Sequence, residues 1–239
     1  MDESSLVIEA FTELAPRYEQ VMERELQELW LLHYPDFVQR VTETLSSDGQ
    51  RLVLDVATGT AQIPVAFAKR APARKVVGLD ITPAMLKGGL ANIKASGLSP
   101  QIRLVCASAM KMPLASCAFD AVSCALGMHH MDVPNVLREM KRVLRDGGQV
   151  VIACVRAPAL WRTALATAVI RFATLVYARS HRNARAHAEA DAVPNLRTIL
   201  EWHAVLHASG FSAVEVVAEF RPRRFWYPGA MILRAFKAN

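Results

Sequence analysis

Two aspartates, each closing a short apolar segment, are the residues of this chain best suited to recognise a ligand. Asp55 lies in the segment 52–56, and Asp80 ends the segment 75–80. They are separated by about twenty-five residues, the length of a strand, a crossover helix and a return strand in a βαβ unit. A carboxylate at the carboxyl end of the second strand can accept hydrogen bonds from both cis hydroxyls of a ribose. The spacing therefore predicts a nucleoside site.

The loop after the first of these segments contains one glycine, Gly59, which lets a flat ligand approach the backbone. A dinucleotide-binding loop, G-x-G-x-x-G, would also need glycine at Ala57 and Gln62, and Gln62 would crowd a pyrophosphate at the next helix start. The phosphate-binding pattern G-x-x-x-x-G-K-[ST] is missing from the sequence. A ribose without a pyrophosphate is therefore favoured. A nicotinamide-dependent oxidoreductase and a non-catalytic binding module stay open as alternatives.

The order and spacing of several segments between residues 50 and 155 resemble the class I S-adenosylmethionine-dependent methyltransferases. The acid and glycine loop 55–61 corresponds to their first motif. Asp80 corresponds to the second, followed by a helix start with Thr82 as cap and Pro83 in the first turn. The other segments that resemble the family are 108–110 at the end of the third strand, 113–122 as the fourth strand, and 138–148 as the helix and turn before the fifth.

The resemblance implies S-adenosylmethionine as the methyl donor and S-adenosylhomocysteine as the product. Asp80 would hold the ribose, the backbone of 57–61 the methionine end, and Ala109 with Met110 the adenine. The residues implied in cofactor binding are Asp55, Ala57, Thr58, Gly59, Thr60, Ala61, Asp80, Ile81, Met85, Ser108, Ala109, Met110 and Leu126. The reaction would be an in-line transfer to carbon or oxygen of a small, largely apolar acceptor, which is quinone-like, lipid-like or a secondary metabolite. Such a transfer depends mainly on holding donor and acceptor in line.

The segment 125–132 follows the expected fourth strand, and in the relatives it passes beneath the methyl donor and faces the acceptor. Its adjacent His129 and His130 are the candidate general bases, because an imidazole near its free pKa takes a proton at neutral pH. Neighbours on a loop rarely point the same way, so one histidine is expected to be structural and His129 to face the pocket. Met128 is expected beside the substrate. The histidines form no recognisable ligand cluster with carboxylates, so no metal is expected.

Residues 1–46 are expected to form a helical lid. The segment 11–19 resembles the part in front of the core in the ubiquinone and menaquinone C-methyltransferases (methyltransferase type 11), where a tyrosine near Tyr18 faces the cofactor. The alternative is that Tyr18 is only a half-buried helix aromatic. His33 lies in the same lid and would face the substrate. The chain departs from this group at His129-His130, where its members have Arg-Asn, which indicates a different acceptor pocket.

Residues 157–178 are the longest apolar stretch outside the expected strands. Arg162 and Arg171 interrupt it, and each would cost about 2.5–3.5 kcal/mol at the centre of a bilayer, so no membrane span is expected. The stretch is expected to form a helical cap over the acceptor site. The side chains expected to shape its apolar pocket are Trp161, Phe172 and Tyr177. The alternative is an interfacial helix that touches a membrane to collect a lipophilic substrate.

The alternation of apolar strands and helices predicts an α/β fold, a doubly wound Rossmann-like seven-stranded sheet with helices on both faces. Ligands in such sheets bind at the carboxyl ends of the strands. One methyltransferase domain, 1–239, is expected. Its parts are the N-terminal helical lid 1–46, a turn at 46–49, the cofactor-binding core 47–155, the helical cap 156–195 with a linker at 188–194, and a last helix and strand hairpin at 196–239.

The composition is that of a globular chain, with 52% hydrophobic and 21% charged residues. A net charge of +6 favours anionic partners such as a membrane surface. The basic segments lack the interleaved aromatic residues of a nucleic-acid stacking platform, so no nucleic acid is expected. Cys106, Cys117, Cys124 and Cys154 show no C-x-x-C spacing and are expected to be reduced and buried. The acidic amino terminus, without an apolar signal segment, favours the cytoplasm. No oligomeric state is predicted.

Overall fold

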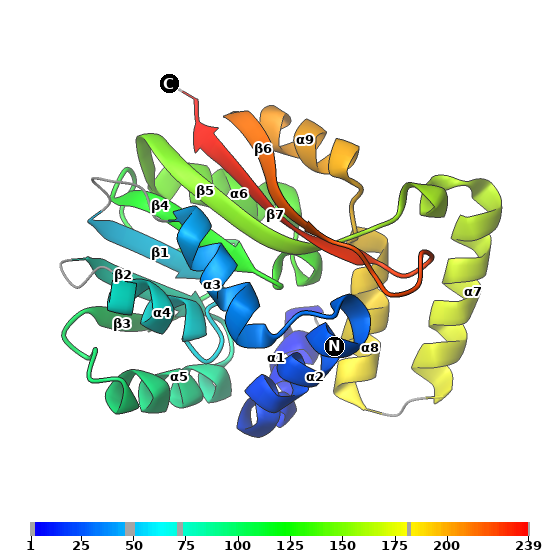
Figure 1. Ribbon diagram of the computed structural model, residues 1–239, viewed down its shortest axis with the longest axis horizontal. Coiled ribbons are helices and arrows are strands. Elements are labelled where there is room, and N and C mark those ends of the chain that lie inside the picture. Colours follow the sequence, from blue (N-terminus) through cyan, green and yellow to red (C-terminus); the bar gives the residue numbers. More distant parts are fainter. Residues whose placement is uncertain (1–2, 46–50, 71–73, 181–182, 239) are drawn as a thin grey trace.

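A mixed sheet forms the centre of the computed structural model, which describes residues 3–45, 51–70, 74–180 and 183–238. Its strands are β1 Leu52–Val56, β2 Lys75–Asp80, β3 Ile102–Cys106, β4 Phe119–Ala125, β5 Leu144–Arg156, β6 Phe211–Phe220 and β7 Gly229–Lys237. They form a 7-stranded sheet in the order β3-β2-β1-β4-β5-β7-β6 (Figure 1). β7 runs antiparallel to β5 and β6, and the other pairs are parallel. The predicted doubly wound sheet is confirmed; the expected turn at 46–49 lies outside the described residues.

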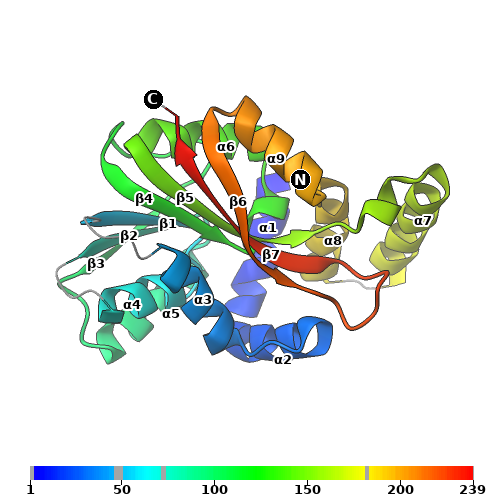
Figure 2. The same ribbon diagram turned by 45° about the horizontal axis from the view of Figure 1, so that its top comes forward.

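Helices cover both faces of the sheet (Figures 1 and 2). The helices are α1 Glu3–Leu14, α2 Tyr18–Trp30, α3 Tyr34–Leu45, α4 Gln62–Arg70, α5 Pro83–Ala95, α6 Val133–Val143, α7 Ala164–Ser180, α8 Ala184–Ala192 and α9 Ile199–Ala208. Short 3₁₀ turns are η1 Ala15–Arg17, η2 Met128–His130, η3 Ala159–Arg162 and η4 Val193–Asn195. The core on one face includes Leu137 of α6 and Trp202 of α9. On the other face it includes Phe37 of α3 and Phe67 of α4. The sheet is thus buried on both sides.

The strands that end in the two aspartates have the expected bounds. Val53, Leu54 and Val56 of β1 are almost completely buried, because neighbouring strands and helices on both faces enclose them. β1 pairs in parallel with β2, which sets Asp55 opposite Gly78. A Cβ on Gly78 would lie 2.8 Å from Thr58 Oγ1, so only glycine lets the loop after β1 pack against β2. The first two strands and their loop therefore form one tightly packed unit.

The expected linker at 188–194 is wrong, because most of it belongs to helix α8. Asn183 stands at the N-cap, and its side-chain oxygen accepts a hydrogen bond of 2.7 Å from the Ala186 backbone N–H. Alanine loses no side-chain entropy in a helix, so this alanine-rich segment is a strong helix former. Its small buried alanines allow close packing, and α8 lies against α1 and η2. The cap therefore reaches the core through α8.

α7 lies on the outer side of the cap, where it contacts α8 and η3 (Figures 1 and 2). Several of its large apolar side chains are exposed, among them Leu165 and Phe172. Among the helices that the structure describes, none combines the length and apolarity needed to cross a bilayer. The outer face of the cap thus presents exposed apolar side chains of α7.

The four cysteines are free, but only Cys124 and Cys154 are buried. Cys106 ends β3, the edge strand, and Cys117 precedes β4 at a positive φ of 53°. Both are exposed, so the expectation of four buried thiols is wrong for these two. An edge strand and a turn expose side chains that a central strand would bury.

Candidate active site

A cavity of about 950 Å³, including the space at its open mouth, lies at the carboxyl ends of the first four strands. Asp80 contributes from the end of β2, and the loops after β1, β3 and β4 contribute Gly59, Ser108 and Leu126, respectively. Helix α1 adds Val7 and Phe11 to the wall. The cavity is therefore where a doubly wound sheet binds its ligand.

Asp80 is the acid that the cavity presents at the end of β2. Its Oδ2 accepts a hydrogen bond of 2.8 Å from the Gly59 N–H, and its Oδ1 accepts one of 2.8 Å from the Thr82 N–H. These bonds hold the carboxylate in place, and each oxygen retains a lone pair for a further donor. Burial raises the pKa of Asp80, whereas the backbone hydrogen bonds from Thr82 and Gly59 lower it. A ligand with two adjacent hydroxyls matches this carboxylate.

The loop after β1 owes its shape to left-handed backbone conformations. Gly59 has a φ of +53°, and a Cβ there would lie 3.1 Å from Met85 Cε at the cavity wall. Ala57 and Leu126, which also line the cavity, have positive φ values of 54° and 55°. Such conformations are strained for residues with a side chain and often occur at binding sites. Glycine at position 59 keeps the backbone open to the ligand.

Asp55 lies beneath the loop and lines a second cavity, a small hollow of about 300 Å³ including the open space at its mouth, which shares Tyr18, Ala57, Ala125 and Leu126 with the first. Its oxygens accept hydrogen bonds from Ser123 Oγ at 2.6 Å and Thr58 Oγ1 at 2.7 Å. Burial raises the pKa of Asp55 to about 7, against the lowering effect of the two hydroxyls. The second cavity therefore carries a buried acid that titrates near neutrality.

Tyr18, at the start of α2, lines both cavities. Its ring meets that of Tyr34 edge to face at 6.3 Å between centroids. Burial raises the pKa of Tyr18, and the nearby Asp80 adds to the effect. The hydroxyl is therefore neutral at physiological pH, so it can donate a hydrogen bond but does not supply a charge.

The other residues predicted to bind the donor fall into two groups. Those that line the main cavity are Ala57, Ile81, Met85, Ser108, Ala109, Met110 and Leu126, and Thr58 lines the second cavity. Thr60 and Ala61 are buried but line neither cavity. Thr60 instead supports the loop, because its carbonyl accepts a hydrogen bond of 3.0 Å from Asn92 Nδ2. The structure thus brings most of the predicted donor residues together.

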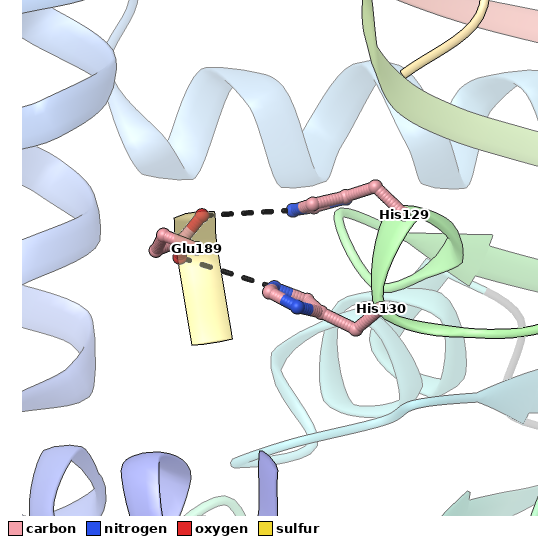
Figure 3. A group of neighbouring side chains, drawn as sticks. All are labelled: His129, His130 and Glu189. Carbon is pink, nitrogen blue, oxygen red and sulfur yellow. Dashed lines mark ion pairs between the residues drawn. The ribbon is translucent and has the colours of Figure 1, made fainter. Parts of the chain in front are cut away.

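His129 and His130 lie in η2, directly after β4, with ring centroids 4.1 Å apart. Both imidazoles point toward Glu189 of α8 (Figure 3). His130 lines the cavity, whereas His129 does not, so the expectation that His129 faces the pocket is wrong. The edge contact between His130 and the Phe11 ring, at 5.4 Å, keeps His130 against the lid.

Glu189 corrects a second expectation, that the histidines have no carboxylate partner. Its Oε2 lies 3.9 Å from His129 Nε2, and its Oε1 lies 3.9 Å from His130 Nε2. Burial lowers the pKa of His129, and so does the neighbouring His130. Burial also lowers the pKa of His130, although Glu189 opposes the shift. Both imidazoles are therefore neutral at pH 7.

The residues expected to bind the acceptor mostly lie elsewhere. Met128 is fully buried in the core, and the exposed His33 pairs with Glu23 at 2.6 Å. Trp161 donates a hydrogen bond of 3.1 Å to the Trp226 carbonyl, while Phe172 and Tyr177 are exposed on α7. These residues line neither cavity, so the expected apolar pocket under the cap is not formed by them. The reason is that α8, rather than α7, forms the inner layer of the cap.

Several cavity residues were not singled out as site residues from the sequence. Four of them, Ala125, Gly127, Met131 and Asp132, belong to the segment 125–132 that was expected at the site, and the others are Val7, Phe11, Leu79, Thr82 and Ala107. Asp132 caps α6, since its side chain accepts a hydrogen bond from the Asn135 N–H. Small residues at the strand ends, such as Ala107 and Ala125, are a signal that a ligand lies close to the backbone. For Val7 and Phe11, the sequence pattern predicts an amphipathic helix but not that these side chains line a cavity.

The fold is that of solved class I methyltransferases. The structure is similar to that of a methyltransferase from Bacillus halodurans, with a TM-score of 0.64 and 22% identity over 85% of this chain and 100% of that one. It is also similar to geranyl diphosphate methyltransferase in complex with S-adenosylmethionine, with a TM-score of 0.67 and 14% identity over 85% of both chains. At these identities the likeness establishes a shared fold.

Residues 2–182 match the model of the ubiE/COQ5 methyltransferase family, and the chain belongs to this family. It is 35% identical over 162 residues to the demethylmenaquinone methyltransferase of Deinococcus radiodurans, covering 66% of this chain and 64% of that one. It is 34% identical over 143 residues to the enzyme of that name from Thermus thermophilus, covering 59% and 62%. The chain thus spans somewhat less than two thirds of these relatives. The family predicted from the sequence is confirmed.

Proposed function

We propose that this protein transfers a methyl group from S-adenosylmethionine to a small, largely apolar, quinone-like acceptor. The observation that carries the proposal is the Asp80 carboxylate, held by two backbone N–H groups and exposed to the cavity beside Gly59. This arrangement fits the ribose of a nucleoside donor. Membership of the ubiE/COQ5 family and relatives named for demethylmenaquinone support the donor and the class of acceptor. The four free cysteines agree with a cytoplasmic setting.

The donor would be held along the loops at the ends of the strands. Asp80 would accept hydrogen bonds from the ribose hydroxyls, and Ala109 and Met110 would pack against the adenine. Gly59, with Asp55 and Tyr18 beside it, would hold the methionine end. S-adenosylmethionine supplies, when bound, an electrophilic methyl group on a sulfonium and leaves as S-adenosylhomocysteine. The wall that carries Phe11 and His130 is then the acceptor side.

The donor assignment is tested by thermal unfolding with S-adenosylhomocysteine and, in parallel, with NADH. A ligand at about a hundred times its Kd stabilises the folded state by roughly 2.7 kcal/mol. We expect S-adenosylhomocysteine to raise the Tm and NADH to leave it unchanged, because Gln62 replaces the glycine that a pyrophosphate would require. A rise with NADH alone would favour the oxidoreductase. A Tm unchanged by either ligand would favour the non-catalytic binding module.

His130 would take the proton when the acceptor carries one, because it is the histidine that lines the cavity. Replacing His130 by glutamine should lower the rate of methyl transfer to a short-chain demethylmenaquinol by about a hundredfold or more, the size of a lost general base. The matched His129→Gln variant should lose less than about tenfold. Single-turnover rates with labelled donor measure both. Equal losses in the two variants would contradict the assignment to His130.

A lipophilic acceptor has to be collected, and we propose that α7 touches an anionic membrane surface. Leu165, Val169, Phe172 and Val176 are 77%, 58%, 69% and 49% exposed and recur along α7 at a helical spacing. The connection between β6 and β7 adds exposed Phe225 and Trp226, and Trp161 links it to the cap. Arg221, Arg223 and Arg224 in that connection supply positive charge. This apolar and basic surface matches an interfacial helix.

Vesicle sedimentation tests the membrane contact. The double variant Leu165→Ser with Phe172→Ser should bind phosphatidylglycerol vesicles about tenfold more weakly, because two inserting side chains are lost. Leu200→Ser is the matched control, since Leu200 is 82% exposed on α9, away from α7. Binding that is unaffected by the double variant, or equally weakened by Leu200→Ser, would contradict the proposal.

A further inference from the structure

His129, His130 and Glu189 form a cluster whose geometry the proposed methyl transfer does not require. A base needs one imidazole, yet both rings direct Nε2 at the same carboxylate, each toward a different oxygen (Figure 3). The possible ligand atoms of the three side chains all lie within 4.8 Å of one another. The side chains of His129 and His130 are 11% and 4% exposed, and that of Glu189 is 39% exposed. The cluster is thus a largely enclosed group with one open side.

The spacing within this cluster is that of ligands around a cation. Each imidazole nitrogen lies 3.9 Å from its carboxylate oxygen, which is too long for a hydrogen bond. Zinc binds imidazole nitrogen at about 2.0–2.1 Å and carboxylate oxygen at about 2.0–2.2 Å, so an ion between the two atoms spans up to roughly 4.2 Å. This limit applies to a linear arrangement, and a tetrahedral ion places its ligand atoms about 3.4 Å apart. The two 3.9 Å gaps would therefore each close by roughly half an ångström when an ion binds all three side chains.

The negative charge of Glu189 also has no close cationic partner within the cluster. Arg185 Nε lies 3.9 Å from Glu189 Oε1, but Arg185 is engaged with both carboxylate oxygens of Glu25 at 2.7 Å. In the part of the chain that the structure describes, the Glu189 carboxylate accepts no side-chain hydrogen bond, and its ion-pair partners lie at 3.9 Å. The Nδ1 atoms of His129 and His130 are buried and also lack a partner among the described residues. Two largely enclosed imidazoles and a carboxylate therefore face one another, and their lone pairs are not engaged in short hydrogen bonds.

We propose that His129, His130 and Glu189 bind a divalent transition-metal cation, with Zn²⁺ as its representative. Two imidazoles and one carboxylate suit such an ion, and three protein ligands leave a coordination position open. The ligands come from η2 of the core and α8 of the cap, so the ion would join the cap to the core at the edge of the cavity that His130 lines. The proposal goes beyond the methyl transfer and does not depend on it. A bound ion takes the lone pairs that would otherwise accept a proton, so loaded and metal-free protein would use these histidines differently.

The test is calorimetric titration of the purified, tag-free, full-length chain with Zn²⁺, together with visible absorption after loading with Co²⁺. We expect one tight equivalent and the absorption bands of a Co²⁺ ion in a site of low coordination number. Glu189→Gln and His129→Asn should each weaken binding at least about tenfold, since loss of a ligand costs no less than loss of a group that supports one. The matched control is the double variant His203→Gln with His207→Gln, which removes another neighbouring histidine pair, on α9, and should keep the tight equivalent.

Three results would overturn the metal site, and a separate titration tests the donor cavity. Tight binding that survives both Glu189→Gln and His129→Asn, or that disappears with the α9 histidines, would overturn the site, as would no binding at all. Circular dichroism of each variant shows whether it is folded, and if one variant is unfolded the other decides. Titration of the unaltered protein with S-adenosylhomocysteine in the presence of a chelator tests the donor cavity separately. Failure of that titration would leave the metal site standing.

Discussion

Replacing Asp80 by asparagine should weaken S-adenosylhomocysteine binding by about a hundredfold or more. The carboxylate oxygens are held by the N–H groups of Gly59 and Thr82, and the ribose hydroxyls would use their remaining lone pairs. Two hydrogen bonds to a charged group contribute at least about 1.5 kcal/mol each, so losing them costs roughly 3 kcal/mol, a hundredfold in Kd. An amide also presents an N–H₂ where an acceptor is needed. Isothermal titration measures the Kd directly.

Two controls accompany the Asp80 experiment. Asp36→Asn removes an exposed carboxylate in the first turn of α3 and should leave the Kd unchanged. Chemical unfolding of Asp80→Asn without ligand establishes how much stability is lost, because the substitution also changes the partner of two backbone N–H groups. A Kd within about threefold of the unaltered protein, in a folded variant, would refute the role of Asp80.

The titration of Asp55 should lower the free energy of unfolding as the pH rises from about 4 to 7. Burial raises its pKa from the ordinary value of 3.8 to about 7. A raised pKa means that the folded protein prefers the protonated acid, so the stabilisation is fully present below the unfolded pKa and lost as the pH approaches 7. A shift of this size corresponds to roughly 4 kcal/mol between the two limits. The charged groups facing Asp55 do not offset this, since Asp80 raises its pKa further.

The measurement is the free energy of unfolding in urea between pH 4.5 and 8, compared between the unaltered protein and Asp55→Asn. Other groups also titrate in this range, so the difference between the two curves carries the result. Asparagine keeps the shape and can still bond to Ser123 and Thr58, but it does not ionise. The curves should converge toward low pH and separate toward pH 8, with the variant relatively more stable there. Parallel curves would contradict a raised pKa.

The strands and loops proposed to hold the donor could be located from the sequence, because the signals that define them are local. A strand buried on both faces is a continuous apolar run, so β1 and β2 had clear bounds, and the loop with Gly59 and the acid Asp80 followed directly. The acceptor side depends on contacts that no local pattern encodes. The chain enters η2 through Leu126 at a positive φ of 55°, a conformation that the sequence does not signal, and His130 rather than His129 lines the cavity. Glu189 belongs to an alanine-rich helix with no apolar stripe of large residues, so a linker was expected where α8 continues, and the approach of Glu189 to the histidines was not predicted.

The contacts of α1 and α2 with α8 constrain the order in which the parts of this protein can fold during synthesis on the ribosome. Arg185 of α8 pairs with Glu25 of α2 across 160 positions of sequence, and α1 packs on α8 as well. The amino-terminal helices are therefore made first but find this partner only after most of the chain has been synthesised. Until α8 has been made, α1 lacks the helix that it packs against. Its apolar side chains Val7 and Phe11, which line the cavity in the folded protein, are then less well covered. The strands β1 to β4 can therefore assemble early, whereas the wall that α1 forms at the cavity is fixed in place only after α8 has been synthesised.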